Sequence, residues 1–505
     1  MGIIARQSIK GALANYLGVA IGFVVTFFVL TRCLSEEEVG LTRVMVDAAV
    51  LFSCVAQLGT GASLVKFFPH FKDDHGSHGI FGLALLVPLV GFLVVSLLLL
   101  LLRQPLLAAY SERSPLVADY FFLVPMLTFF TLYLTVFETG ASVLMRITVP
   151  KMVREVGIRL FTLADYVLYG LDLISLDLFV WLFCGAYGLA MLLGLAYLLR
   201  ITGGDRRLFR IDWHFLNPQR RREMVRYTLF MTATVIAGNI PLLGTLFVGA
   251  KAGAALTGVY AIAAYIANVV EVPYRSLGAI SRPVVAQAVK DNNWPEVNRL
   301  VQQVSLHQLL VSLAILFLIW VNLPALYALL GDSYARGTAV VLVLGLAKVL
   351  NSSLSIATDL LNYSAYYTRS LLFIALLTLG ALLLNSLLIA PLGIAGSAAA
   401  TLLSYAVYYA CLLLFVWRRM RVSLFSAAQL KVLALMAAAF ALNLLWQRLA
   451  APLAAQGLWP LLASSAAETL LLGSLLAAAL YRWRVSPTLC RMADQLTKQN
   501  HRNTE

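Results

Sequence analysis

Long apolar runs recur from one end of this sequence to the other. A run of about 20 apolar residues, folded as an α-helix, is long enough to cross the roughly 30 Å hydrocarbon core of a bilayer. Fourteen such runs, joined by short connectors, predict an all-α polytopic membrane protein with 14 transmembrane helices. The expected spans are residues 9–31, 41–63, 79–102, 118–138, 154–174, 177–199, 227–249, 257–280, 303–323, 337–361, 370–391, 394–416, 428–449 and 459–481.

The composition agrees with this class. Hydrophobic residues make up 61% of the chain and charged residues 12%, whereas about 25% of the residues in a typical soluble domain are charged. The five cysteines are scattered and odd in number, which does not indicate a disulfide framework. The amino-terminal apolar stretch resembles a secretory signal, but it is long and no small-residue cleavage site follows it. We therefore expect it to be a retained first span.

The most basic stretch is GGDRRLFRIDWHFLNPQRRREMVR, residues 203–226. Such a run can bind nucleic acid, attract an anionic membrane surface or form a loop that insertion leaves in the cytoplasm. No RNP, zinc-finger or helix-turn-helix pattern accompanies it, which argues against nucleic acid as a partner. If the N-terminus is inside, 30 of the 38 Lys and Arg residues fall on the inner side and 7 on the outer side. The asymmetry predicts a cytoplasmic linker, two cytoplasmic termini and attraction to anionic membrane lipid.

An internal repeat relates two segments of the chain. EVGLTRVMVDAAVLFSCVAQLGTGASLVKFFPHF (38–71) and LTGVYAIAAYIANVVEVPYRSLGAISRPVVAQAV (256–289) both run from a glycine through a span to another glycine, a basic residue and a proline. Their first glycines, Gly40 and Gly258, are 218 residues apart. Six spans separate the two segments, and because six is even, two six-helix lobes would share one orientation, as in transporters built from parallel repeats. We expect an N-lobe at 1–202, a linker at 203–226, a C-lobe at 227–420, and two extra helices with a cytoplasmic tail at 421–505.

The tenth expected span carries a stripe of polar side chains. At 100° per residue they fall within an arc of about 100°, and ionisable groups at membrane depth cost several kcal/mol unless they face water or a partner. The stripe therefore predicts one wall of an aqueous cavity. The alternative is that these groups bond only to neighbouring helices, as Ser and Asn commonly do. The stripe comprises Lys348, Asn351, Ser352, Ser355, Asp359, Asn362 and Tyr366.

Other expected spans add ionisable groups to the predicted cavity. In span two, Arg43 and Asp47 are four residues apart and either face the cavity or neutralise each other. Span eight can bend at Pro273. One face of span eight carries Thr257, Asn268, Glu271 and Arg275, while Arg159, Asp165 and Glu468 lie in spans five and fourteen. Together these residues predict a central cavity with charges of both signs.

Two further patterns receive structural interpretations. HFKDDHGSH (70–78) gathers histidines and aspartates in an inner loop, but nothing there fixes four ligands in a tetrahedron, so we expect a solvated loop and no metal. LSEEEVG (34–40) predicts a capping box formed by Ser35 and Glu38. No hydrolase, zinc-protease or nucleotide-binding motif occurs, so we expect neither an enzyme nor a cofactor.

Several longer segments resemble a known family. LTGVYAIAAYIANVVEVPYRSLGAISRPVVAQAV, LYALLGDSYARGTAVVLVLGLAKVL (326–350) and especially LLLNSLLIAPLGIAGSAAATLLSYAVYY (382–409) resemble the polysaccharide-transporter branch of the multidrug/oligosaccharidyl-lipid/polysaccharide exporter superfamily. The most specific points are Asn385, Gly393 and Gly396. The sequence departs from that branch at Lys66, where Arg is more usual, and in span seven, which lacks an acidic residue often found there.

The resemblance implies a flippase in the bacterial cytoplasmic (inner) membrane. Such proteins move undecaprenyl-pyrophosphate-linked oligosaccharides of O-antigen, capsule or exopolysaccharide outward by alternating access of two lobes. A flipped lipid needs a polar, cation-lined cavity for its headgroup and a lateral opening for its tail. We expect Lys66, Arg159, Arg275 and Lys348 to contact phosphate, Asn268, Asn351 and Ser352 to meet sugar hydroxyls, and Asp47, Glu271 or Asp359 to bind a coupling H⁺ or Na⁺.

The expected partners are the lipid-linked oligosaccharide and membrane lipid, with contacts to a polysaccharide polymerase or to glycosyltransferases. Two other functions stay open. One is a cation-coupled exporter of drugs or metabolites with the same fold. The other is a polytopic membrane glycosyltransferase or polymerase, which the short outer loops disfavour because they leave no room for a large catalytic loop.

Overall fold

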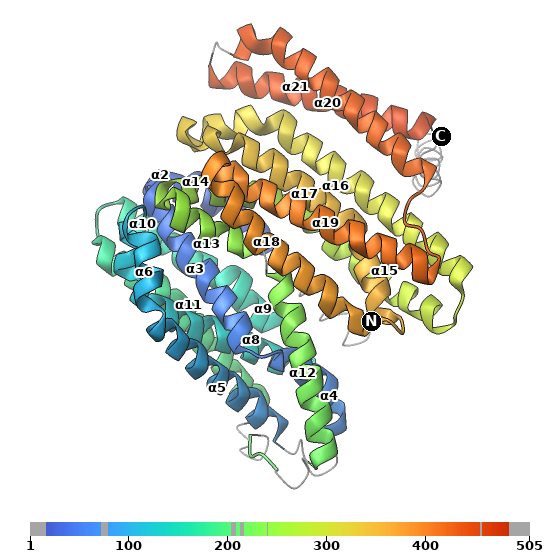
Figure 1. Cartoon of the computed structure of the whole chain (residues 1–505). Helices are drawn as coiled ribbons and strands as arrows, with labels where there is room; N and C mark the ends of the chain where they lie inside the picture. Colours follow the sequence, from blue (N-terminus) through green and yellow to red (C-terminus); the bar gives the residue numbers. More distant parts are fainter. Residues whose placement is uncertain are drawn as a thin grey trace, which may run out of the picture. The chain divides into compact units, whose positions relative to one another are not determined.

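Every regular element that can be described in this chain is a helix (Figure 1). The computed structural model describes residues 17–71, 79–203, 209–212, 217–239, 241–454 and 457–483. The predicted His-Asp loop of residues 70–78 lies, apart from His70 and Phe71, outside these residues.

The helices fall into two compact units. Unit 1 runs to Ala261 and includes Ala381–Ser397, and unit 2 comprises Ile262–Gly380 and the chain from Ala398 onward. The elements up to α14 are η1 (Val25–Leu30), α2 (Thr31–Cys33), α3 (Glu36–Ala56), α4 (Thr60–Phe71), α5 (Ile80–Leu101), α6 (Arg103–Ser111), α7 (Pro115–Tyr120), η2 (Phe121–Leu123), α8 (Val124–Val143), α9 (Thr148–Met152), η3 (Val153–Gly157), α10 (Ile158–Gly170), α11 (Leu176–Ile201), α12 (Pro218–Gly238), α13 (Pro241–Ala252) and α14 (Ala254–Asn268). They continue as η5 (Val269–Glu271), α15 (Val272–Lys290), α16 (Trp294–Leu330), η6 (Asp332–Gly337), α17 (Thr338–Tyr363), η7 (Tyr367–Arg369), α18 (Ser370–Leu392), α19 (Ile394–Met420), α20 (Ala427–Ala454) and α21 (Leu458–Arg482).

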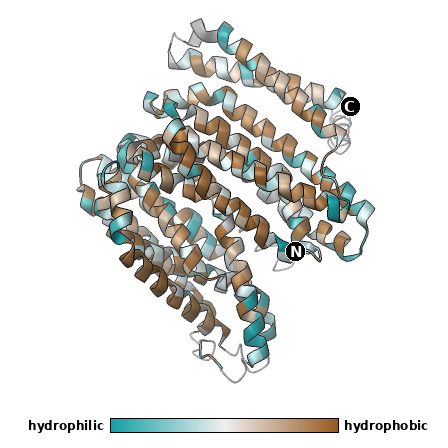
Figure 2. Ribbon diagram, in the orientation of Figure 1, coloured by the Kyte–Doolittle hydropathy of each residue, from teal (hydrophilic) through white to brown (hydrophobic). Residues whose placement is uncertain are grey.

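Eleven helices in the described part of the chain are long and apolar enough to cross a membrane. Three of the fourteen expected spans are not among them. Span one is described only from Leu17, span five is divided between η3 and α10, and span seven is divided between α12 and α13. The last division falls between Gly238 and Pro241, where a proline lacks the backbone N–H that a continuous helix would use. Figure 2 shows α12 as hydrophilic along its first half, whereas α5 is hydrophobic almost throughout.

The capping box at the start of α3 is confirmed. The Glu38 backbone N–H donates to the Ser35 side chain, and the Ser35 N–H donates to the Glu38 carboxylate at 2.8 Å. The expected span 41–63 is nevertheless interrupted, because the backbone turns at Leu58 and Gly59, both at positive φ, before α4 begins. Two features favour glycine at position 59. Its φ is positive, and a Cβ there would lie 2.4 Å from the Thr228 carbonyl oxygen.

The α3 and α14 helices cross in unit 1 through a reciprocal glycine contact. A Cβ on Gly40 would lie 1.9 Å from the carbonyl oxygen of Ala254, and a Cβ on Gly258 would lie 2.1 Å from that of Glu36. The offset of 218 residues that relates Gly40 to Gly258 also relates Glu36 to Ala254. Each glycine thus packs on the residue four positions before its partner glycine, as a two-fold related pair of helices would.

Alanine at either glycine should force the α3–α14 crossing apart. We expect Gly40→Ala or Gly258→Ala to destabilise the protein by about 1–3 kcal/mol, because the added methyl meets backbone and not a movable side chain. Thermal unfolding of the purified protein in detergent measures the effect. Gly185→Ala in α11 is the control, since nothing lies within 4 Å of the position of its added Cβ. Equal melting temperatures for all three variants would contradict the close crossing.

Candidate functional site

The polar stripe of α17 meets a carboxylate at the end of α14. Lys348 Nζ lies 3.2 Å from Glu271 Oε2, and Asn351 Nδ2 donates to Glu271 Oε1 at 2.8 Å. Only 6% of the Lys348 side chain and 12% of the Glu271 side chain are exposed. Glu271 closes the 3-10 turn η5, and Pro273 in the first turn of α15 follows it. The carboxylate therefore has both oxygens engaged, and the lysine is a buried, paired cation.

Tyrosines of α19 extend this cluster. The Tyr409 hydroxyl donates to Asn351 Oδ1 at 2.7 Å, and the Thr358 and Tyr408 hydroxyls share a hydrogen bond of 2.9 Å. The Tyr408 and Tyr409 rings contact each other edge to face, with their centroids 4.8 Å apart. Asn351 thus links Glu271 to an aromatic, hydroxyl-bearing face of unit 2.

A second ion pair lies farther along α17. Arg282 Nε donates to Asp359 Oδ2 at 3.0 Å, and Arg282 Nη2 donates to the Tyr274 hydroxyl at 2.6 Å. Burial lowers the pKa of Arg282, but the Asp359 carboxylate and Tyr274 outweigh it, so the pKa is raised above the usual arginine value. Arg282 stays charged and neutralises Asp359. Asp359 follows Lys348 by eleven residues, about 16 Å along the helix axis, so the two pairs lie at two separate levels of one stripe.

We name these residues the unit 2 wall: Glu271, Tyr274, Arg282, Lys348, Asn351, Thr358, Asp359, Tyr408 and Tyr409. Four of its residues were nominated from the sequence: Glu271, Lys348, Asn351 and Asp359. Ser352 is also buried on α17, and among the described residues its hydroxyl has no hydrogen-bond partner. Asn268 is exposed, and the Arg275 side chain lies outside the described residues.

Unit 1 contains ion pairs of its own. Arg43 Nε donates to Asp47 Oδ2 at 2.9 Å, which is the mutual neutralisation that the sequence left open. Arg154 donates to Glu138 at 2.5 Å and to the Thr135 hydroxyl at 2.7 Å. The predicted phosphate ligand Arg159 pairs with Glu155 four residues earlier, at 3.2 Å, and is partly buried. The membrane-embedded carboxylates Asp47 and Glu138 therefore each hold an arginine.

Exposed basic side chains gather on the first turns of α12. A cavity of about 1070 Å³ is lined there by Arg221, Arg222, Glu223 and Arg226, which we name the basic pocket. All four residues are exposed. Arginine presents a planar fork of donors that matches phosphate oxygens in a bidentate manner, so this pocket can bind a phosphate or pyrophosphate group.

Lys66 of α4 is held beside the basic pocket. Its Nζ lies 4.1 Å from the centre of the Tyr227 ring and 3.7 Å from Glu223 Oε1. The Ser63 and Thr228 hydroxyls join the same two helices at 2.5 Å. Of the four cations nominated from the sequence, Lys66 is the one that the described structure brings to this pocket. The sequence offered a signal for the arginines that was interpreted as topology and attraction to anionic lipid: Arg222 and Arg226 are four residues apart, just before the expected span 227–249.

Solved structures share this fold. The lipid II flippase MurJ in an inward closed conformation matches with a TM-score of 0.65 at 11% identity, over 95% of this chain and 100% of that chain. An inward-facing multidrug resistance MATE family transporter of the MOP superfamily matches with a TM-score of 0.58 at 16% identity, over 83% of this chain and 98% of that chain. A MOP superfamily transporter from Pyrococcus furiosus matches with a TM-score of 0.58 at 14% identity, over 83% and 95%. No curated protein sequence matches the chain.

The fold and the spans define a multi-pass α-helical membrane protein with the architecture of these transporters. The family model described as polysaccharide biosynthesis protein matches residues 4–289, more than half of the chain. The chain belongs to this family, which confirms the resemblance found in the sequence.

Breaking the Lys348–Glu271 pair should cost more than removing it. We expect Lys348→Met or Glu271→Gln alone to lower the stability by about 3–5 kcal/mol, because each leaves its partner charge buried, whereas the double variant recovers most of the loss. Thermal unfolding of the wild type and the three variants completes the cycle. Additive losses in the double variant would show that the two charges do not depend on each other.

Proposed function

We propose that this protein flips a polyprenyl-pyrophosphate-linked oligosaccharide across the bacterial cytoplasmic membrane by alternating access. The observation that carries the proposal is the basic pocket, in which exposed arginines gather at the start of a helix of a polysaccharide-biosynthesis family member. A pyrophosphate needs cations that are accessible from water, and the basic pocket has them. The glycan is a unit of O-antigen, capsule or exopolysaccharide.

The other nominated residues take roles that their contacts allow. Lys66 joins Arg222 and Arg226 in binding pyrophosphate as it arrives. Asn268 is exposed and can meet sugar hydroxyls. Asn351 and Ser352 remain proposed sugar ligands, available only when the contacts that bury them open. Arg159, Arg275 and Lys348 remain proposed phosphate ligands, with Lys348 available only when Glu271 releases it.

This last condition suggests how a cation couples to transport. Asp47, Glu271 and Asp359 each hold a basic side chain. A proton or Na⁺ that binds one of these carboxylates weakens its ion pair and frees a cation for the phosphate. Coupling in the proposed mechanism is therefore an exchange of partners between carboxylate, basic side chain and substrate.

We propose a topology of 14 spans with both termini in the cytoplasm. The N-lobe (1–202) and C-lobe (227–420) are parallel repeats joined by the linker, and the last two spans follow. The reciprocal contact of Gly40 and Gly258 supports the repeat, because residues related by the same offset make equivalent contacts. A periplasmic signal from a reporter inserted beside Asn217 would overturn the topology. We expect that reporter to signal cytoplasm.

Neutralising the basic pocket should stop glycan export. We expect Arg222→Gln with Arg226→Gln to abolish surface glycan in a deletion strain and to accumulate lipid-linked oligosaccharide on the cytoplasmic face, because the pocket loses two phosphate donors. The matched control is Arg418→Gln with Arg419→Gln, which removes two exposed positive charges from the end of α19.

The same strains separate this proposal from drug export. Normal surface glycan in the Arg222/Arg226 variant, at normal protein amounts, would refute the role of the basic pocket. Unchanged lipid-linked oligosaccharide in the deletion strain, together with new sensitivity to cationic dyes, would favour an exporter of drugs or metabolites.

A further inference from the structure

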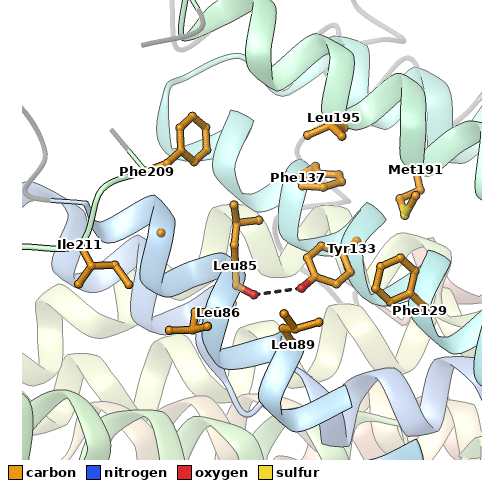
Figure 3. A pocket seen from close by; sticks show the side chains of 11 residues that line it. Leu85, Leu86, Leu89, Phe129, Tyr133, Phe137, Met191, Leu195, Phe209 and Ile211 are labelled. Carbon is orange, nitrogen blue, oxygen red and sulfur yellow. Dashed lines mark hydrogen bonds between the residues drawn. The ribbon is translucent and has the colours of Figure 1, made fainter. Parts of the chain in front are cut away.

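A second cavity in unit 1 is chemically the opposite of the basic pocket. It measures about 530 Å³ and lies among α5, α8 and α11 (Figure 3). Leucines, phenylalanines and a methionine surround it, including Leu85, Leu89, Phe129, Phe137 and Met191. Its volume falls within the range of about 300–1000 Å³ typical of small-molecule sites.

Among the described residues that line the cavity, none has a polar side chain free to bind a polar ligand. Figure 3 shows the one hydroxyl in its lining, that of Tyr133, turned to the Leu85 carbonyl oxygen, to which it donates at 3.0 Å. A polar ligand group would lose its hydrogen bonds to water here and gain none. The lining therefore selects a hydrocarbon.

The cavity opens on a surface that lies in the bilayer. In α5, one of the eleven candidate spans, Leu86 is 41% exposed and Leu89 is 37% exposed, and both line the cavity. The next exposed residues along α5 are apolar as well, among them Val90 and Leu93. Hydrocarbon chains surround such a surface, and filling the cavity with one restores the dispersion contacts that an empty space would lose.

Residues 209–212 of the linker lie against the cavity. Phe209 and Ile211 both belong to the lining, while Arg210 between them is exposed. The linker sits directly on α5: Cβ atoms on Gly79 and Gly82 would lie 2.0 Å and 2.1 Å from the carbonyl oxygens of Arg210 and Phe209. Part of the linker therefore forms one wall of this cavity.

A second exposed arginine, Arg200, lies in the last turn of α11. Leu195 of α11 lines the cavity, and Arg200 follows five residues later, about 7.5 Å along the helix axis. An apolar cavity with basic side chains beyond its end matches a molecule that has a hydrocarbon chain and a negatively charged headgroup.

We propose that this cavity binds one acyl chain of an anionic phospholipid, whose phosphate contacts Arg210 and Arg200. The bound lipid fastens the linker to α5, since Phe209 and Ile211 pack on its chain while Arg210 holds its headgroup. The site is separate from the basic pocket and does not depend on which substrate the protein transports.

Photo-cross-linking of the full-length protein in phosphatidylcholine nanodiscs tests the site. The probe is phosphatidylglycerol with a diazirine on one acyl chain, and adducts are located by peptide mass spectrometry. We expect adducts on the lining segments of α5, α8 and α11 that disappear when Leu89→Trp and Met191→Phe fill the cavity. Leu93→Trp is the control, because Leu93 is exposed on the same helix but does not line the cavity. Leu86→Trp replaces the double variant if that one fails to fold.

The headgroup contact is tested with a matched phosphatidylcholine probe. We expect Arg210→Gln to lower labelling by phosphatidylglycerol about fivefold, the effect of one basic residue near anionic lipid, and to leave phosphatidylcholine labelling unchanged. Undiminished adducts in the filled variants would overturn the cavity as the binding site. Equal labelling of the wild type by both probes would overturn headgroup recognition. Displacement of the adducts by polyprenyl phosphate, but not by excess phosphatidylglycerol, would assign the cavity to a polyprenyl chain instead.

Discussion

Hydrocarbon offers no hydrogen-bond partner, so a charge in the spans is costly unless another group of the protein pairs with it, and much of the structure follows from this constraint. Backbone groups meet it by forming helices. Side chains meet it in pairs: Lys348 with Glu271, Arg282 with Asp359, and Arg43 with Asp47. Because each of these three carboxylates is matched by a basic side chain, none of them can change its partner without another group taking its place. The same residues therefore stabilise the fold while they are paired, and in the proposed mechanism they couple a cation to transport when a pair is broken.

Cations in this protein therefore divide into two sets by their surroundings. Basic side chains of the first set are paired with carboxylates inside the spans, so a ligand must compete with those carboxylates to bind them. The arginines of the basic pocket are exposed at the start of α12, where a phosphate can approach without first breaking a buried pair. A substrate that carries pyrophosphate can thus bind first at the basic pocket and only later draw on the buried set.

The sequence was informative where a property is local. Apolar runs located the helices, Ser35 and Glu38 located a cap, and the period of α17 placed Lys348, Asn351 and Asp359 on one face. Partners distant in sequence could not be inferred in this way: Arg282 lies two residues beyond the expected span 257–280, and no local pattern links it to Asp359, 77 residues later, which it neutralises. Helix interruptions were missed for a related reason. No hydropathy pattern records either the left-handed turn at Leu58 and Gly59 or the close approach of Thr228 to Gly59.

Glycine contacts and ion pairs hold the helices in different ways. Lipid is as apolar as leucine, so helices associate in a membrane through close packing and polar contacts. The crossing of α3 and α14 uses packing alone at Gly40 and Gly258, and separating it would leave no charge without a partner. Opening the unit 2 wall would leave the buried charges of Lys348 and Glu271 without their partners. If alternating access operates as proposed, movement should therefore begin at the glycine crossing, and the ion-paired wall should rearrange only when a proton, Na⁺ or phosphate supplies the missing partner.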